Sequence, residues 1–230
     1  MTRSISLPGR SLASVASVLA ALPFVGSLAC TQVRYTEAFS PEGQVDRIVV
    51  LADAGLVELV AGDSLRVERA IRAPEAALTL GHHVQDGTLY LEAHCARLLP
   101  CAVDTHVEVP AGVPVRVDLG RGEVWATGIS RLDLELDQGA ADVEVLGDLV
   151  ASIGSGGIRA RLGAGGSGRV GVGDGDIEVE VPQGAWTVDA DTARLQLHDL
   201  EPVGDGTGHL ELTAPAGSVT VRGTAGVALR

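Results

Sequence analysis

A serial repeat of short alternating segments, separated by turns rich in glycine, is the feature that most constrains this chain. From Val103 onward apolar residues recur at every second position, which indicates strands and not helices. An aliphatic residue returns to an equivalent place roughly every 19 residues, within a range of about 15 to 24. These places are held by Val124, Val143, Ile158, Ile177, Leu195 and Val219.

A unit with one apolar face cannot bury that face alone, so successive units must stack to form a common core. We therefore predict an all-β fold, a right-handed β-solenoid or β-helix-like stack of short strands. The alternative is an antiparallel β-sandwich, in which strands alternate in the same way. The 30 glycines favour a solenoid, because tight corners recur twice in every unit.

Residues 45–230 are expected to form one β-strand-repeat domain, with an N-terminal hairpin part over 45–102 and the repeats over 103–225. In the first part, Gln85–Thr88 has the composition of a hairpin turn, because glycine accepts positive φ. Ala73–Leu80 is the one stretch that could form one or two helical turns, with Pro74 near its start.

The first 29 residues have the pattern of a signal peptide. Arg3 and Arg10 precede an uncharged run, Leu12–Leu22, and small residues follow before Cys30. Gly26–Cys30 resembles the bacterial lipobox, and this resemblance implies a palmitate-bearing lipoprotein held to the membrane through a lipid on Cys30. Residues 30–44 would then be the lipidated cysteine and a tether, since they show no periodicity.

The expected location is the bacterial cell envelope, with the outer membrane as the anchoring membrane. Two alternatives stay open for the same segment. Ordinary cleavage would give a soluble periplasmic or secreted protein, and an uncleaved segment would be an anchor helix, which Pro23 and the short apolar run disfavour.

The charge balance excludes some partners. The chain contains 17 basic residues, all arginine, and 30 acidic residues, which gives a net charge of −13. Removal of residues 1–29 takes away two arginines and no acid, which leaves −15. Nucleic acid is excluded as a partner, because phosphate binding requires a basic face.

Cys95 and Cys101 are expected to form a disulfide, because nearby cysteines normally pair in an oxidising compartment. Two other interpretations are a Cys₂His₂ metal site that includes His94 and His106, and free thiols.

The repeats resemble a known family. Val107–Val117, followed by segments such as Gly173–Val179, is similar to the DUF4097-type β-strand-repeat domain, called a putative adhesin domain. The resemblance covers about residues 45–225. It implies a solenoid-like all-β fold on an exported bacterial protein, and it brings no agreed catalytic residues.

We predict no catalytic residue and no cofactor. Asp174 and Asp176 are calcium candidates because of their glycine-rich turn, and solvated acidic turns are the competing interpretation. Arg159, Arg161 and Arg169 form a basic cluster that is expected to pair with neighbouring acidic coils. Alternation places several acidic residues on the solvent face: Glu123, Asp133, Glu135, Glu144, Glu178 and Glu180.

The export signal and the repeat together predict a non-enzymatic cell-envelope lipoprotein, an adhesin-like binding or structural module. Its partner would be an envelope protein or a glycan. The alternatives are a carbohydrate-active β-helix enzyme, whose paired carboxylates would have to be desolvated, and a regulatory or sensor module for another envelope protein.

Overall fold

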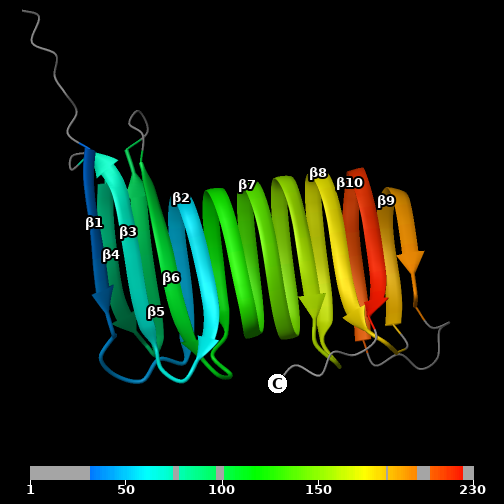
Figure 1. Cartoon of the computed structure of the whole chain (residues 1–230), viewed down its shortest axis with the longest axis horizontal. Coiled ribbons are helices and arrows are strands. Elements are labelled where there is room, and N and C mark those ends of the chain that lie inside the picture. The colour runs from blue at the N-terminus through cyan, green and yellow to red at the C-terminus, as the bar shows by residue number, and fades with distance from the viewer. Residues whose placement is uncertain (1–31, 75–77, 97–100, 185, 201–207, 225–230) are drawn as a thin grey trace, which may run out of the picture. The chain divides into compact units, whose positions relative to one another are not determined.

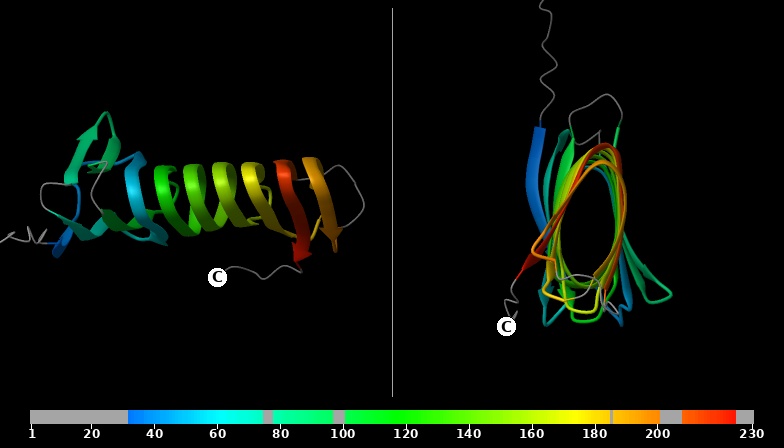
Figure 2. Two further views of the ribbon diagram at one scale, coloured as in Figure 1. Left: turned by 90° about the horizontal axis from the view of Figure 1, so that it is seen from above. Right: turned by 90° about the vertical axis from the view of Figure 1, so that its right-hand side faces the viewer.

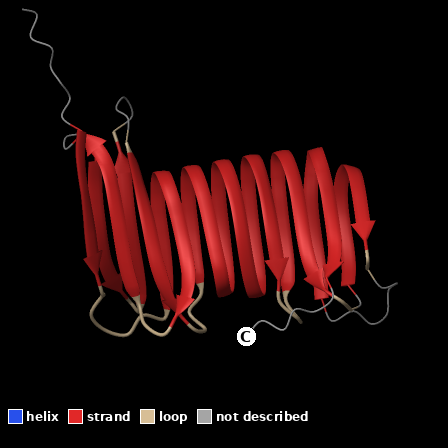
Figure 3. Cartoon of the chain, viewed as in Figure 1, coloured by secondary structure: helices blue, strands red, loops and turns tan. Residues whose placement is uncertain are grey.

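The computed structural model describes residues 32–74, 78–96, 101–184, 186–200 and 208–224, and these residues form strands and turns with no helix. Thr31–Arg230 form a compact unit of their own. Its strands wind into flattened coils, each one turn of a solenoid, that lie side by side (Figures 1 and 3). No helix in the described ranges is long and apolar enough to cross a membrane.

In the residues that the structure describes, ten strands make up the sheet. They are β1 (Gln32–Phe39), β2 (Arg47–Gly62), β3 (Arg66–Pro74), β4 (Leu78–Gln85), β5 (Thr88–Cys95), β6 (Ala102–Pro110), β7 (Val115–Leu162), β8 (Ser167–Pro182), β9 (Trp186–His198) and β10 (Gly208–Thr224).

The long strands pair in parallel, so the stacked arrangement is confirmed and the antiparallel β-sandwich is ruled out. β7 alone has 48 residues and winds through three coils, and β2, β8, β10 and β9 each contribute one more. Leu149 pairs with Gly168, and Ile158 with Ile177, at the predicted separation of 19 residues. Within β7 the separation is 17, as in the Arg116–Asp133 contact. The right-handed sense of the winding stays a prediction.

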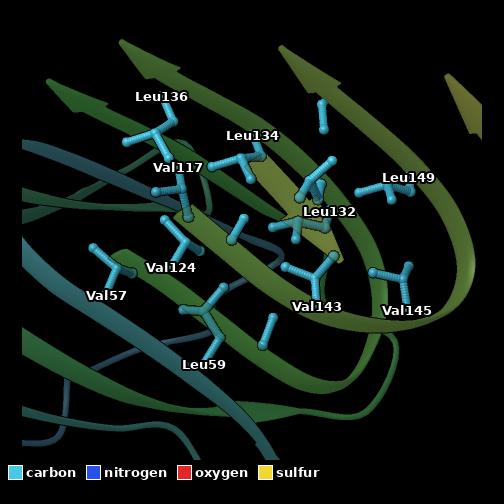
Figure 4. Close-up of a cluster of buried hydrophobic side chains, with 14 of the residues drawn as sticks. Val57, Leu59, Val117, Val124, Leu132, Leu134, Leu136, Val143, Val145 and Leu149 are labelled. Atoms are coloured by element: carbon cyan, nitrogen blue, oxygen red, sulfur yellow. The ribbon is translucent and has the colours of Figure 1, made fainter. Parts of the chain in front are cut away.

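Each coil has two flat sides, seen end-on as the long sides of an oval (Figure 2, right). We call face A the side formed by Val115–Leu119 and the residues in register with it, and face B the side formed by Glu123–Thr127 and its register partners. Side chains that point inward from both faces meet in one core (Figure 4). They are aliphatic and almost fully buried, for example Val57, Leu59 and Val124. Each buried side chain of this size contributes roughly 1.5–3 kcal/mol.

The order of coils in the stack differs from the order in the chain. The sheet runs β1-β3-β6-β2-β7-β8-β10-β9. β2 lies between β6 and β7 and pairs in parallel with both. It comes from the segment that was expected to form the N-terminal hairpin part. β10 lies between β8 and β9, so Val219 pairs with both Ile177 and Leu195. The expectation that successive units stack in sequence is therefore wrong at both ends.

Antiparallel strands close the N-terminal end of the stack. β3 pairs with β6 and β4 pairs with β5, and β1 then pairs with β3. The segment 30–44, expected to be an irregular tether, thus contains β1. The helical expectation for Ala73–Leu80 is also wrong for its described residues, which belong to β3 and β4. As strands, those residues pair with the edges of β5 and β6. If they formed a helix, the backbone groups along those edges would have no partner.

The hairpin turn predicted at Gln85–Thr88 is confirmed. Asp86 has a φ of 50° and Gly87 a φ of 73°. Positive φ at both central residues is the type I′ geometry, whose twist matches that of the flanking strands.

A buried arginine belongs to this N-terminal cap. Arg69 occupies an inward position of β3 and is only 1% exposed. Its Nη1 donates to Glu37 Oε1 of β1 at 3.3 Å, and its Nη2 donates to the Gly81 carbonyl of β4 at 3.0 Å. Burial lowers the pKa of Arg69, and the Glu37 carboxylate opposes that change. The cap is therefore held by polar contacts as well as by apolar packing.

One corner of the coils is a column of glycines. Gly55, Gly122, Gly139, Gly156 and Gly175 all have φ between +132° and +146°. A Cβ on any of the last four would collide with the carbonyl oxygen of the glycine in the preceding coil. This column also sets the phase of the repeat. Because Gly139 stacks on Gly122, the residue of the next coil that is equivalent to Val124 is Ala141. The sequence pattern assigned that place to Val143, which instead occupies the next inward position along the strand.

Replacement of one glycine in this column should destabilise the whole stack. We expect Gly139→Ala to lower the free energy of unfolding by about 2 kcal/mol or more, because the methyl group strains the backbone and collides with Gly122. Urea unfolding followed by circular dichroism measures the loss. Gly171→Ala is the matched control, since its Cβ would have no neighbour within 4 Å and its φ is not positive. Equal losses in both variants would contradict the role of the column.

Candidate functional site

Cys95 and Cys101 are joined by a disulfide, with their Cα atoms 5.8 Å apart. The thiolates needed for a Cys₂His₂ metal site are therefore consumed. The two histidines have other neighbours: His94 Nδ1 lies 3.5 Å from Asp53 Oδ1, and His106 Nδ1 lies 3.0 Å from Glu58 Oε2. Cys30, the predicted lipid anchor, lies outside the described residues.

Asp176 makes a contact between coils, which accounts for its position without a metal. Its Oδ1 accepts hydrogen bonds from the Ser218 backbone N–H at 2.8 Å and from Ser218 Oγ at 2.7 Å. These hydrogen bonds lower the pKa of Asp176. Asp174 lies two residues earlier on the same corner, opposite Ser155 of the preceding coil. In the described part of the chain, no three His, Cys, Asp or Glu side chains gather closely enough to hold a metal ion.

Charged side chains on both faces pair from one coil to the next. The Glu178 carboxylate accepts hydrogen bonds from Arg159 Nη2 at 3.0 Å and from Arg222 Nη1 at 2.6 Å. These two arginines belong to the coils on either side of Glu178. The Glu178 contact raises the pKa of Arg159. On face A, Arg131 pairs with Asp148 at 2.8 Å. The prediction that arginines pair with acidic neighbours in adjacent coils is confirmed.

The basic cluster expected from the sequence is divided between the two faces. Arg159 and Arg161 lie on face B, whereas Arg169 lies on face A and pairs with Glu211 at 2.7 Å. These arginines therefore offer no single basic patch.

Face A carries a groove of about 500 Å³. Val150, 45% exposed, lies in it among charged side chains. Its acids and arginines largely neutralise one another, as in the Arg131–Asp148 and Arg169–Glu211 pairs. The remaining lining residues with polar or charged side chains are Arg47, Asp133, Ser167 and His209.

Face B carries a second hollow, of about 390 Å³, around an exposed tryptophan. Trp125 is 47% exposed because its neighbours Val124 and Ala126 point into the core. Glu58 of β2 is the register partner of Trp125 in the coil on one side, and Asp142 lies in the coil on the other side. Thr127 and Arg161 complete the polar rim, and Arg161 lies 3.5 Å from Asp142. An aromatic ring is thus flanked by two carboxylates on the sheet surface of face B.

Trp125 was not among the residues predicted to form a site, although the sequence carries a signal for its exposure. In Glu123–Thr127 the alternation assigns Val124 and Ala126 to the core, so Trp125 must point outward. The neighbouring Glu58 could not have been found in this way, because it comes from β2, which is inserted into the stack from far earlier in the chain.

No family model and no curated protein matches this chain. Several solved structures are similar to it. A putative cell adhesion protein from Clostridium sporogenes has 11% identity and a TM-score of 0.47, over 84% of this chain and 100% of that one. A putative adhesin from Bacteroides fragilis has 10% identity and a TM-score of 0.41, over 84% and 97%.

A third structure, a putative lipid binding protein from Parabacteroides distasonis, has 12% identity and a TM-score of 0.30, over 84% of this chain and 95% of that one. At identities of 10–12% and TM-scores of 0.47 and lower, these similarities assign no function to the chain.

The Asp176–Ser218 contact predicts a specific dependence of stability on pH. The folded state lowers the Asp176 pKa, so its contribution is present above the ordinary carboxyl pKa of about 4 and is lost as the pH falls through the lowered value. Asp176→Asn should therefore be less stable than the wild type at pH 7, and the difference should narrow in strong acid. Urea unfolding at both pH values measures it.

Ser218→Ala is the companion variant, because it removes the hydroxyl donor and keeps the backbone N–H donor. It should lose less stability than Asp176→Asn at pH 7. A difference between Asp176→Asn and the wild type that is equally large at both pH values would contradict the assignment.

Proposed function

We propose that this protein is a non-enzymatic, adhesin-like module of the bacterial cell envelope that binds a glycan at the Trp125 hollow and is anchored through a lipid on Cys30. The observation that carries the proposal is the exposed Trp125 ring between Glu58 and Asp142 on face B. A binding site of this kind needs a rigid support, and the parallel coils beneath it provide one.

The chemistry of the hollow suits a neutral sugar. The face of an aromatic ring carries partial negative charge, which attracts the weakly positive C–H groups on one side of a pyranose ring. Carboxylates beside the ring accept hydrogen bonds from sugar hydroxyls, and Asp142 and Glu58 occupy those positions. An anionic glycan fits less well, because two acids flank the ring and the mature chain has a net charge of −15.

The enzyme alternative finds less support at this hollow. A glycosidase needs a carboxylic acid in a desolvated pocket beside a second carboxylate. Asp142 is 45% exposed and Glu58 40% exposed, and each lies against a basic side chain, Arg161 and His106 respectively. Both carboxylates are therefore solvent-exposed, which suits binding better than proton transfer.

The glycan proposal predicts a signal from one tryptophan. Trp186 is only 5% exposed, so Trp125 alone should report a ligand at the surface. Titration with neutral oligosaccharides of glucose and of N-acetylglucosamine should change the fluorescence, and Trp125→Ala should weaken the affinity at least about tenfold by calorimetry.

Val150→Ala, which alters the exposed side chain on face A, is the control and should leave the affinity unchanged. No binding of any oligosaccharide, or equal affinity in Trp125→Ala, would overturn the glycan proposal. Cleavage of the oligosaccharides during the titration would favour the enzyme alternative.

The anchor is tested separately. Cells grown with labelled palmitate should incorporate the label into the full-length protein, and Cys30→Ser should abolish the incorporation because it removes the acceptor thiol. A Cys95→Ser, Cys101→Ser double variant should keep the label, since those thiols are joined in a disulfide. Label that persists in Cys30→Ser, or no label in the wild type, would contradict lipid anchoring and leave the glycan proposal standing.

A further inference from the structure

The two ends of the stack differ in how they finish. β1 and β9 lie at opposite ends (Figure 1). At the β1 end, antiparallel strands and the polar contacts of Arg69 close the core. Among the described residues β9 pairs only with β10, so its other edge has backbone groups without a strand partner. A repeat stack normally needs a polar terminal unit at each end.

β9 also leaves core-type side chains partly uncovered. Leu195 and Leu197 are in register with the buried Val219 and Val221, yet they are 46% and 51% exposed. Val188 and Ala190, on face A of the same coil, are only partly buried. β9 therefore presents an unpaired strand edge together with an apolar surface that continues the core.

The sequence of β9 is complementary to itself in the antiparallel direction. A two-fold axis through its corner, between Thr192 and Ala193, would bring face A of one copy beside face B of the other. Val188 would then lie opposite Leu197 of the second copy, and Ala190 opposite Leu195. Because residues paired across antiparallel strands point to the same side, each inward side chain meets another inward side chain.

The outward residues agree with the same register. Asp191 would lie opposite Arg194 of the second copy, and the symmetry creates this pair twice. Neither residue forms an ion pair within the part of the chain that the structure describes. By contrast, pairing of face A with face A in the register that aligns Val188 with Ala190 would oppose Asp189 with its own copy, which is unfavourable. The charges therefore favour the pairing of face A with face B over that register.

We propose that the β9 end is an interaction surface for a second copy of this chain, paired tail to tail through antiparallel β9 strands. The pairing would continue the sheet across the two-fold axis and cover Leu195 and Leu197. It is independent of the glycan site, because Trp125 lies in the first coil of β7, several coils away from β9.

Charge swaps in the chain from Thr31 onward test the pairing. At concentrations on the order of 100 μM, where contacts of micromolar affinity are occupied, light scattering after size exclusion should show a dimer. Asp191→Arg and Arg194→Asp should each weaken dimerisation at least about tenfold, because each places like charges opposite one another. The double variant should restore it. Both residues are exposed, so circular dichroism should show an unchanged fold.

Cross-linking tests the register. Asp189 and Gln196 of the second copy are opposite one another, so an equimolar mixture of Asp189→Cys and Gln196→Cys chains should form a disulfide-linked dimer. Neither variant alone should do so, since neither residue lies opposite its own copy. The native cysteines do not interfere, because Cys95 and Cys101 are already paired. A wild-type chain that stays monomeric, a double charge variant that fails to restore the dimer, or a mixture that does not cross-link would overturn the proposal.

Discussion

The close approach of backbones at the glycine corner is the constraint on which the rest of the structure depends. Gly122, Gly139 and Gly156 stack so tightly that no side chain fits between one coil and the next. This contact fixes the rotation of each coil relative to its neighbour, and the rotation in turn decides which side chains enter the core and which form columns outside it. The aliphatic core contributes most of the stabilisation, but the corner determines the register in which that core is built.

The electrostatic character of the surface follows from that register. A chain with an excess of acidic residues would repel itself if like charges stacked, and parallel coils place chemically equivalent positions directly above one another. Here Arg161, Glu180 and Arg222 hold one register position of face B in three successive coils and alternate in sign. Arg161 pairs with Glu180, and Arg222 pairs diagonally with Glu178. Exposed pairs of this kind stabilise little individually. Their main effect is to offset part of the acidic excess around exposed apolar and aromatic side chains such as Trp125 and Val150.

Local patterns predicted much of this fold, and non-local pairing accounts for what they missed. Alternation alone assigned Glu178 to solvent and Ile177 to the core, and the composition of Gln85–Thr88 identified its turn, because each depends only on adjacent residues. The insertion of β2 and β10 could not be predicted, since every strand offers the same apolar face whatever its neighbour. Only part of the Trp125 hollow could be predicted, for the same reason. The exposure of Trp125 follows from the alternation of its immediate neighbours, whereas Glu58 lies beside it only because β2 is inserted next to β7.

The inserted strands also restrict how such a protein can change in length. β2 is enclosed between β6 and β7, and β10 between β8 and β9, so a coil inserted in the sequence next to β2 or β10 would have to enter the stack between strands that are not consecutive in the chain. From β7 into β8 the chain passes through the stack in its own order, and within β7 the step is a regular 17 residues. Duplication or deletion of one 17-residue unit there would lengthen or shorten the rod by a single layer and leave both ends intact. The middle of the molecule is therefore its natural point of evolutionary growth.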